Sequence, residues 1–196
     1  MTGAVEASLR QLAADLVGVG LRWTLIGGFA VSARAEPRFT RDVDVCVLVD
    51  DDEEAEGTGD RLVHRGYTVD SVVEHEKRQR LATIRLISPV SGGVLVDLLF
   101  ASSGIEAEIV EASEPLEILP GLVVPVARAA HLVVLKLLAR DDDTRPQDAI
   151  DLRALRPTLT PADDAEVRRL AALVRARGFH RDRDLMALAE EYLARR

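Results

Sequence analysis

The segment "IGGFAVSARAEPRFTRDVDVCVLV" (residues 26–49) combines a glycine pair with two aspartates inside an apolar run. Asp42 and Asp44 alternate with Val43 and Val45, and residues two apart on a β-strand point to the same face. The two carboxylates would therefore lie side by side on a strand that is otherwise buried. Such an arrangement is costly, because each carboxylate loses hydration and repels the other. The pattern indicates that both aspartates share a cation.

A hard divalent cation suits such a pair, because Mg²⁺ takes oxygen ligands and is held by a few carboxylates together with substrate phosphates. Asp97, in "GVLVDLLF" (residues 93–100), is a third single charge in an apolar run. If the two strands are neighbours, three carboxylates converge, and two metal ions there could activate a hydroxyl and neutralise a leaving pyrophosphate. A structural ion pair with an arginine is the alternative for Asp97.

The glycine pair Gly27–Gly28 separates a predicted strand, "RWTL", from a short helix predicted at 29–35. Backbone N–H groups and the helix dipole can face an anion at such a turn. Glycine lets a phosphate approach the backbone without a Cβ in the way. Ser32 and Thr40 could add hydroxyl donors, with capping or turn roles as the alternative.

The composition is that of a soluble globular chain: 196 residues, 47% hydrophobic and 30% charged. No apolar run approaches the roughly 18 residues that cross a bilayer, and the N-terminus lacks the apolar core of a signal peptide. We therefore expect a cytoplasmic protein without membrane contact. Cys46, the single cysteine, is expected to be a buried thiol. The net charge of −8 argues against a generally nucleic-acid-coating surface but allows a local basic face.

Periodicity predicts a mixed α/β part at 1–125, followed by a helical part at 126–196 that packs on it. The predicted elements are a helix at 4–17, strands at 22–25 and 42–49, an acidic loop before a helix near 59–65, and extended runs at 67–73, 80–89 and 92–101. Further on, they are an ambiguous segment at 104–113, a proline-containing hairpin at 116–127, and helices at 127–140, 145–156, 161–178 and 182–196. Thr160 before Pro161 is predicted to cap the third of these helices.

The order of these motifs resembles the DNA polymerase β-like nucleotidyltransferase superfamily. Ile26-Gly27-Gly28, thirteen intervening residues and then Asp42-Val43-Asp44-Val45 match its signature. The fuller string is similar to the AbiEii/AbiGii toxin-type group, in which Arg-x-Thr-x-Asp-x-Asp recurs, here as Arg38, Thr40, Asp42 and Asp44. "VLKLLARDDDTRPQDAIDLRAL" supplies a second motif with Lys136, Arg140, Asp148 and Asp151. One departure is Gln147-Asp148, where the group often has Lys-Asp.

The resemblance implies a nucleotidyltransferase fold, a small mixed sheet flanked by helices, that moves a nucleoside monophosphate from an NTP with Mg²⁺ or Mn²⁺. Asp42, Asp44 and Asp97 would ligate metal, and Asp97 would help to deprotonate the acceptor hydroxyl. Lys136 would be the phosphate cation, with a solvated helix edge as its alternative. The implied nucleotide contacts are Gly27, Gly28, Ser32, Arg38, Thr40, Lys136 and Asp148. A structural pairing of Asp148 and Asp151 with Arg145 or Arg156 remains the alternative to a role in chemistry.

Three functions fit the sequence. The first is a toxin-like nucleotidyltransferase that modifies an RNA end, such as that of tRNA, or a protein hydroxyl, with an antitoxin as partner. The second is an antibiotic-type adenylyltransferase with an acidic acceptor pocket. The third is a silent module that binds a nucleotide or a partner protein. Basic charge near the site would favour RNA, and acidic charge would favour an aminated small molecule. The C-terminal arginines are expected to be mostly solvated helix positions, with an RNA-contacting stripe as the alternative.

Overall fold

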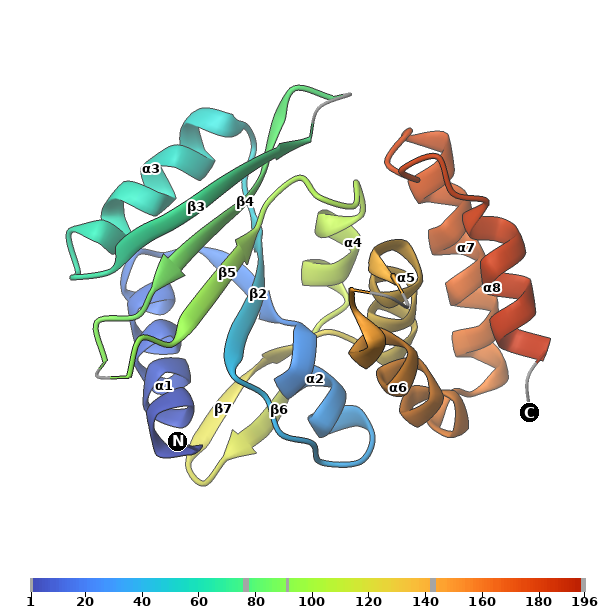
Figure 1. Ribbon diagram of the computed structural model, residues 1–196, viewed down its shortest axis with the longest axis horizontal. Coiled ribbons are helices and arrows are strands. Elements are labelled where there is room, and N and C mark those ends of the chain that lie inside the picture. Colours follow the sequence, from blue (N-terminus) through green and yellow to red (C-terminus); the bar gives the residue numbers. More distant parts are fainter. Residues whose placement is uncertain (1, 76–77, 91, 142–143, 195–196) are drawn as a thin grey trace.

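The computed structural model describes residues 2–75, 78–90, 92–141 and 144–194. Within these residues seven strands form one mixed sheet in the order β3-β4-β5-β2-β1-β7-β6 (Figure 1). The strands are β1 (Arg22–Leu25), β2 (Asp42–Leu48), β3 (Thr68–His75), β4 (Arg80–Ile87), β5 (Leu95–Leu99), β6 (Glu114–Leu119) and β7 (Leu122–Val126). The helices are α1 (Thr2–Gly18), α2 (Gly27–Arg34), α3 (Asp52–Val63), α4 (Glu106–Glu111), α5 (Ala129–Ala139), α6 (Pro146–Leu155), α7 (Pro161–Ala176) and α8 (Leu185–Ala194), with a 3₁₀ turn at Arg156–Thr158. The mixed α/β class that the sequence predicts is confirmed.

Strand β2 occupies the centre of the sheet and pairs antiparallel with β1 and parallel with β5. Val43, Val45 and Val47 are completely buried on one of its faces. Asp42 and Asp44 lie on the opposite face, as the two-residue period of a strand requires. The hydrophobic side of β2 thus anchors the strand in the core while its other side presents the two carboxylates.

Two local predictions need correction. The acidic segment after β2 is the first half of α3, which begins at Asp52 and not near residue 59. The Asp51 side chain accepts a hydrogen bond from Glu54 N at 2.9 Å, and the acidic first turn complements the helix dipole. Helix α2 begins at Gly27, two residues before the predicted start. The glycine turn is therefore part of the first helical turn.

The helices after residue 127 lie together on one side of the molecule, and α5 and α6 stand between α2 and the pair α7–α8 (Figure 1). Helix α5 is mostly core, with Leu132, Val133, Leu137 and Leu138 all buried. Thr160 caps α7 as predicted, in a reciprocal capping box with Asp163. A boundary between two domains at residue 125 stays a prediction.

Cys46 is buried as the sequence predicts, with 1% of its surface exposed. Burial, and next the charge of Glu106, raises the pKa of its thiol well above the ordinary value. The thiol is therefore protonated and packed, which is the state expected of an inert cysteine. In the part of the chain that the structure describes, no helix has both the length and the apolar character needed to cross a bilayer.

His131 on α5 makes stability depend on acid pH. Its side chain is 1% exposed, and burial lowers its pKa to about 4. Between pH 6.5 and 4 the unfolded chain binds a proton here that the folded chain does not, so stability is lost as the pH falls. The free energy of unfolding of the wild type should fall as the pH is lowered from 7.5 to 5. We expect this fall to be smaller by about 1–2 kcal/mol in His131→Leu, measured by urea unfolding. If His131→Leu loses as much unfolding free energy between these pH values as the exposed-site control His64→Gln, His131 is not the source of the pH dependence.

Candidate active site

The carboxylates of β2 and β5 meet because the two strands run parallel in one register. Asp44 lies opposite Asp97, and Asp42 lies opposite Leu95. Residues paired in this way have neighbouring side chains on the same face of the sheet. The structure thus brings together the three carboxylates that the sequence singles out. They line one cavity of about 530 Å³.

The glycine turn packs directly against Asp44. Ile26 N donates a hydrogen bond to Asp44 O at 3.0 Å, and Gly27 has a φ of +61°. A Cβ on Gly27 would lie 1.9 Å from Asp44 Oδ2. Glycine is required here both by the left-handed backbone and by the approach of the carboxylate. The first N–H groups of α2, which have no partner inside the helix, therefore begin beside Asp44.

Thr40 and Ser32 shape the loop between α2 and β2. Thr40 Oγ1 donates to Asp42 Oδ1 at 3.0 Å, and a Cβ on Gly28 would lie 2.5 Å from the same hydroxyl oxygen. Ser32 Oγ accepts a hydrogen bond from Arg38 N at 3.1 Å. Ser32 and Thr40 both line a neighbouring cavity and not the one that the carboxylates line. Their geometry is that of loop and carboxylate positioning; contact with a nucleotide stays a prediction for both.

Asp44 is the electrostatically strained member of the group. Burial, followed by the negative charges of Asp42 and Asp97, raises its pKa to about 7, against the opposing effects of Lys136 and Arg145. A carboxyl with this pKa is easily neutralised by a proton and would be neutralised equally well by a metal ion. The donor set of two carboxylates on adjacent positions of one face suits Mg²⁺, which completes its coordination with water and substrate oxygens.

Asp97 is engaged by an arginine. Arg85 Nε and Nη2 donate to the two oxygens of Asp97, each at 2.7 Å. Arg85 reaches it from β4, whose register places it directly opposite Asp97. Among the residues that the structure describes, no three acidic, histidine or cysteine side chains are grouped closely enough to hold a metal ion. Asp97 can therefore join a metal site only if it exchanges its arginine partner for the ion.

Lys136 is held inside a buried network of charges. Its Nζ lies 2.7 Å from Asp148 Oδ1 and 2.9 Å from Asp151 Oδ2, and both aspartates are almost completely buried. Arg145 Nε donates to Asp148 Oδ2 at 2.8 Å. Burial raises the pKa of Asp151, but hydrogen bonds from Lys136, Gln147 and Arg38 outweigh it and hold the pKa below its ordinary value. The network therefore favours the ionised form of Asp151.

Arg38 ties this network to the loop before β2. Its Nη2 donates to Asp151 Oδ2 at 2.9 Å, and its Nε lies 2.6 Å from Asp151 Oδ1. The pair joins α6 to the segment that carries Thr40 and Asp42. Arg38 and Asp148 thus line the cavity while serving as positioning residues. The structural alternative for Asp148, a pairing with Arg145, is present in the structure, whereas Arg156 pairs with Asp164 instead.

The cavity also has walls that sequence reasoning did not assign. Arg85, Arg145 and Arg181 line it beside the predicted residues, and so do Ser102 and Ser103. Arg181 lies in the segment between α7 and α8, where it is exposed at the wall of the cavity. Because a buried aspartate on a strand needs a cationic partner, Asp97 predicts an arginine on a neighbouring strand, and Arg85 is that residue. We find no sequence signal that would have singled out Arg181.

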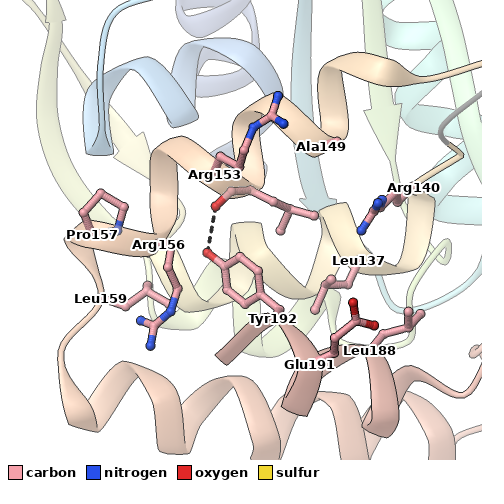
Figure 2. A pocket seen from close by; sticks show the side chains of 11 residues that line it. Leu137, Arg140, Ala149, Arg153, Arg156, Pro157, Leu159, Leu188, Glu191 and Tyr192 are labelled. Carbon is pink, nitrogen blue, oxygen red and sulfur yellow. Dashed lines mark hydrogen bonds between the residues drawn. The ribbon is translucent and has the colours of Figure 1, made fainter. Parts of the chain in front are cut away.

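A second cavity of about 510 Å³ lies between α5, α6 and α8 (Figure 2). Its lining is largely apolar, with Leu137, Leu159 and Leu188 around the ring of Tyr192, whose hydroxyl donates to Leu152 O at 3.0 Å. Arginine side chains surround this apolar lining, and Glu191 is the one carboxylate among the described residues that line it. It lacks the paired carboxylates and the glycine turn, so the cavity at β2 is the candidate active site.

Comparison with known families gives one match to this chain. The family is described as "Nucleotidyl transferase AbiEii toxin, Type IV TA system", and its sequence model matches residues 10–195. The match covers nearly the whole chain, including the helices after residue 156. No protein with a curated function matches the sequence.

Several solved structures share the fold at low sequence identity. ANT(2")-Ia, in complex with adenylyl-2"-tobramycin, has a TM-score of 0.58 and 17% identity, over 90% of this chain and 99% of that chain. A nucleotidyltransferase-like protein from Paracoccidioides brasiliensis has a TM-score of 0.54 and 17% identity, over 96% and 93%. The lincosamide adenylyltransferase LnuA, bound to lincomycin, has a TM-score of 0.50 and 13% identity, over 79% and 98%. These likenesses confirm the nucleotidyltransferase fold.

Replacing Gly27 by alanine tests the contact between the turn and Asp44. Gly121 is a matched control, because its φ is +75° and a Cβ there would meet no atom within 4 Å. Both alanines would carry the cost of a left-handed backbone, about 1 kcal/mol. We expect Gly27→Ala to lose roughly 2 kcal/mol more than Gly121→Ala in urea unfolding, because Asp44 must also move. If the two variants lose equal free energies of unfolding, Asp44 can move away from the new Cβ at no cost, and the contact does not constrain the turn.

Asp44→Asn tests the electrostatic strain. As pH rises from about 4 to 7, the unfolded chain has already released the proton that folded Asp44 still holds, so ionisation destabilises the folded state. In EDTA we expect the variant to gain stability over the wild type as pH rises from 4.5 to 8, by roughly 1–4 kcal/mol in urea unfolding. The exposed-site control Asp60→Asn should show no such gain. If Asp44→Asn gains no more stability than Asp60→Asn over this pH range, the ionised Asp44 carboxylate does not destabilise the folded state.

Proposed function

The chain belongs to the AbiEii nucleotidyltransferase toxin family, and on that premise we propose that it moves a nucleoside monophosphate from an NTP to an acceptor hydroxyl, with Mg²⁺ or Mn²⁺ at Asp42 and Asp44. The convergence of these carboxylates with Asp97 in one cavity, at the start of α2, carries the proposal. A bound divalent ion would supply charge neutralisation for the phosphates and for the attacking oxygen.

The residues of the chain take separate parts in this proposal. The N–H groups at the start of α2, made accessible by Gly27 and Gly28, would receive the triphosphate. Asp97 would accept the proton of the acceptor hydroxyl after leaving Arg85, whose guanidinium would then be available to a phosphate oxygen. Lys136 is held by two buried aspartates, so it would contact a phosphate oxygen only after exchanging one of them for the phosphate.

An RNA end is the acceptor that the charges favour. Among the described residues, five cationic side chains line the cavity: Arg38, Arg85, Lys136, Arg145 and Arg181. Asp97 and Asp148 are each paired with a cation, which leaves Asp42 and Asp44 as the carboxylates for the metal. All of the cations except Arg181 have an aspartate partner, so Arg181 and the largely exposed Arg145 would be the groups that attract a phosphate and repel a cationic acceptor. RNA modification would act as the toxic activity, with an antitoxin protein as the controlling partner.

A small-molecule acceptor is the second candidate. The observation in its favour is the overall likeness to ANT(2")-Ia, which extends over 99% of that chain and includes the helical part. An aminated acceptor would need an acidic pocket, whereas the carboxylates here are mostly paired with arginine or lysine. A silent binding module is the third candidate. The presence of Asp42 and Asp44 side by side, with Asp97 in the same cavity, argues against it.

Incubation with each α-³²P-labelled NTP and Mg²⁺, in the presence of tRNA, cell protein or an aminated antibiotic, tests the proposal. We expect label to appear in RNA. Asp42→Asn and Asp44→Asn should each lower the rate by roughly a hundredfold or more, because the ion's stabilisation of the phosphates is lost. Circular dichroism should show both variants folded.

The control is Asp60→Asn, which removes a carboxylate from the exposed face of α3 and should keep the wild-type rate. Label in the aminated antibiotic but not in RNA would replace the first candidate by the second. No label with any NTP, with no metal-dependent NTP binding, would leave the silent module.

A further inference from the structure

The segment between α7 and α8 (residues 177–184) reaches the wall of the active-site cavity, where it contributes Arg181. Arg181 and Asp182 have φ values of +51° and +58°, in the left-handed region that non-glycine residues rarely adopt. Such backbone costs of order 1 kcal/mol per residue and persists only where the surroundings hold it. The position of Arg181 is therefore imposed by the fold.

Contacts to the start of α4 hold this segment. Arg177 donates to both oxygens of Glu108, at 2.9 and 2.7 Å, and to Gly104 O. The ring of Phe179 lies so close to Gly104 that a Cβ there would be 2.4 Å from it. The backbone that Arg181 contacts is fixed as well, because the Glu106 carboxylate accepts hydrogen bonds from the N–H groups of Ser102 and Ser103, and Arg181 donates to Ser102 O. The segment that carries Arg181 and its contact at Ser102 are therefore both held in place.

In the part of the chain that the structure describes, no carboxylate lies within ion-pair distance of the Arg181 guanidinium. Its Nη2 donates to Ser102 O at 3.1 Å. Partial burial, then the positive charges of Arg145 and Arg183, lowers its pKa from the ordinary value, against the opposing negative charge of Glu106. The residue remains exposed, so an anion that enters the cavity can reach it, and the like-charged neighbours favour such an anion.

Arg145 lies near both Arg181 and the carboxylates of β2 in the same cavity. It pairs with Asp148 through Nε only, and 58% of its side chain is exposed. Its charge also influences the pKa of Asp44, so it lies within electrostatic reach of both Asp44 and Arg181. Two guanidinium groups face one cavity, and their forked donors match the geometry of a phosphate group.

We propose that Arg181 and Arg145 form a phosphate-binding subsite in the wall of the active-site cavity. The phosphate comes either from the NTP or from the backbone of an RNA acceptor, and the two sources share the chemistry that the arginines recognise. The identity of the source rests on the proposed function. The subsite itself does not, because it binds a phosphate whether or not transfer takes place.

Titration with tripolyphosphate and Mg²⁺, followed by isothermal calorimetry, tests the subsite directly. We expect Arg181→Ala to weaken binding about tenfold, the usual effect of losing a charge-assisted pair of hydrogen bonds. Arg181→Lys should recover part of the affinity. Arg183→Ala is the matched control from the same segment, since Arg183 does not line the cavity. Equal affinities of the wild type and Arg181→Ala, with both proteins folded by thermal unfolding, would overturn the proposal.

Kinetics with labelled NTP and RNA distinguish the sources. A tenfold higher KM for the NTP in Arg181→Ala, with kcat within a few fold, would assign the subsite to the triphosphate. The same change in the KM for RNA would assign it to the acceptor. A fall in kcat with both KM values unchanged would overturn the proposal and indicate a structural role. If the wild type transfers nothing, the calorimetric titration still decides the subsite, so the two proposals fail separately.

Discussion

The repulsion between the carboxylates of Asp42 and Asp44 is the constraint around which the site is built. They share one face of β2 because the opposite face, formed by Val43, Val45 and Val47, is committed to the core. Gly27 packs against Asp44 at a distance that no Cβ permits, which places the start of α2 beside the carboxylates. Negative charge and helix N–H groups thus meet at one point, where a metal ion carrying phosphates would satisfy both.

A second set of charges fixes the helices against this strand. Lys136 is neutralised by Asp148 and Asp151, and Asp151 also pairs with Arg38 from the loop that leads into β2. Removing one member of an ion pair that is buried to this degree is costly, because the remaining charge is left without a partner. The network therefore sets the position of α5 and α6 relative to the carboxylates.

The sequence predicts the parts of the site that depend on short-range rules. The two-residue period of a strand places Asp42 with Asp44, and the glycine pair predicts the turn before α2. What it does not predict depends on register and distant packing. Arg85 faces Asp97 only because β4 pairs antiparallel with β5, and Arg181 reaches the cavity only because Arg177 and Phe179 hold its segment against α4. The sequence does not predict that α3 starts at Asp52, because a run of acidic residues is typical of a solvated loop; in the structure Asp51 caps the helix.

A crystal structure with Mn²⁺ and a non-hydrolysable NTP analogue, with anomalous scattering collected at the manganese edge, tests the central claim most directly. We expect an anomalous peak within about 2.0–2.4 Å of oxygens of both Asp42 and Asp44, next to the phosphates of the analogue. The peak should be lost in Asp44→Asn. Phosphates bound elsewhere in the cavity, with no manganese between these two carboxylates, would contradict the claim.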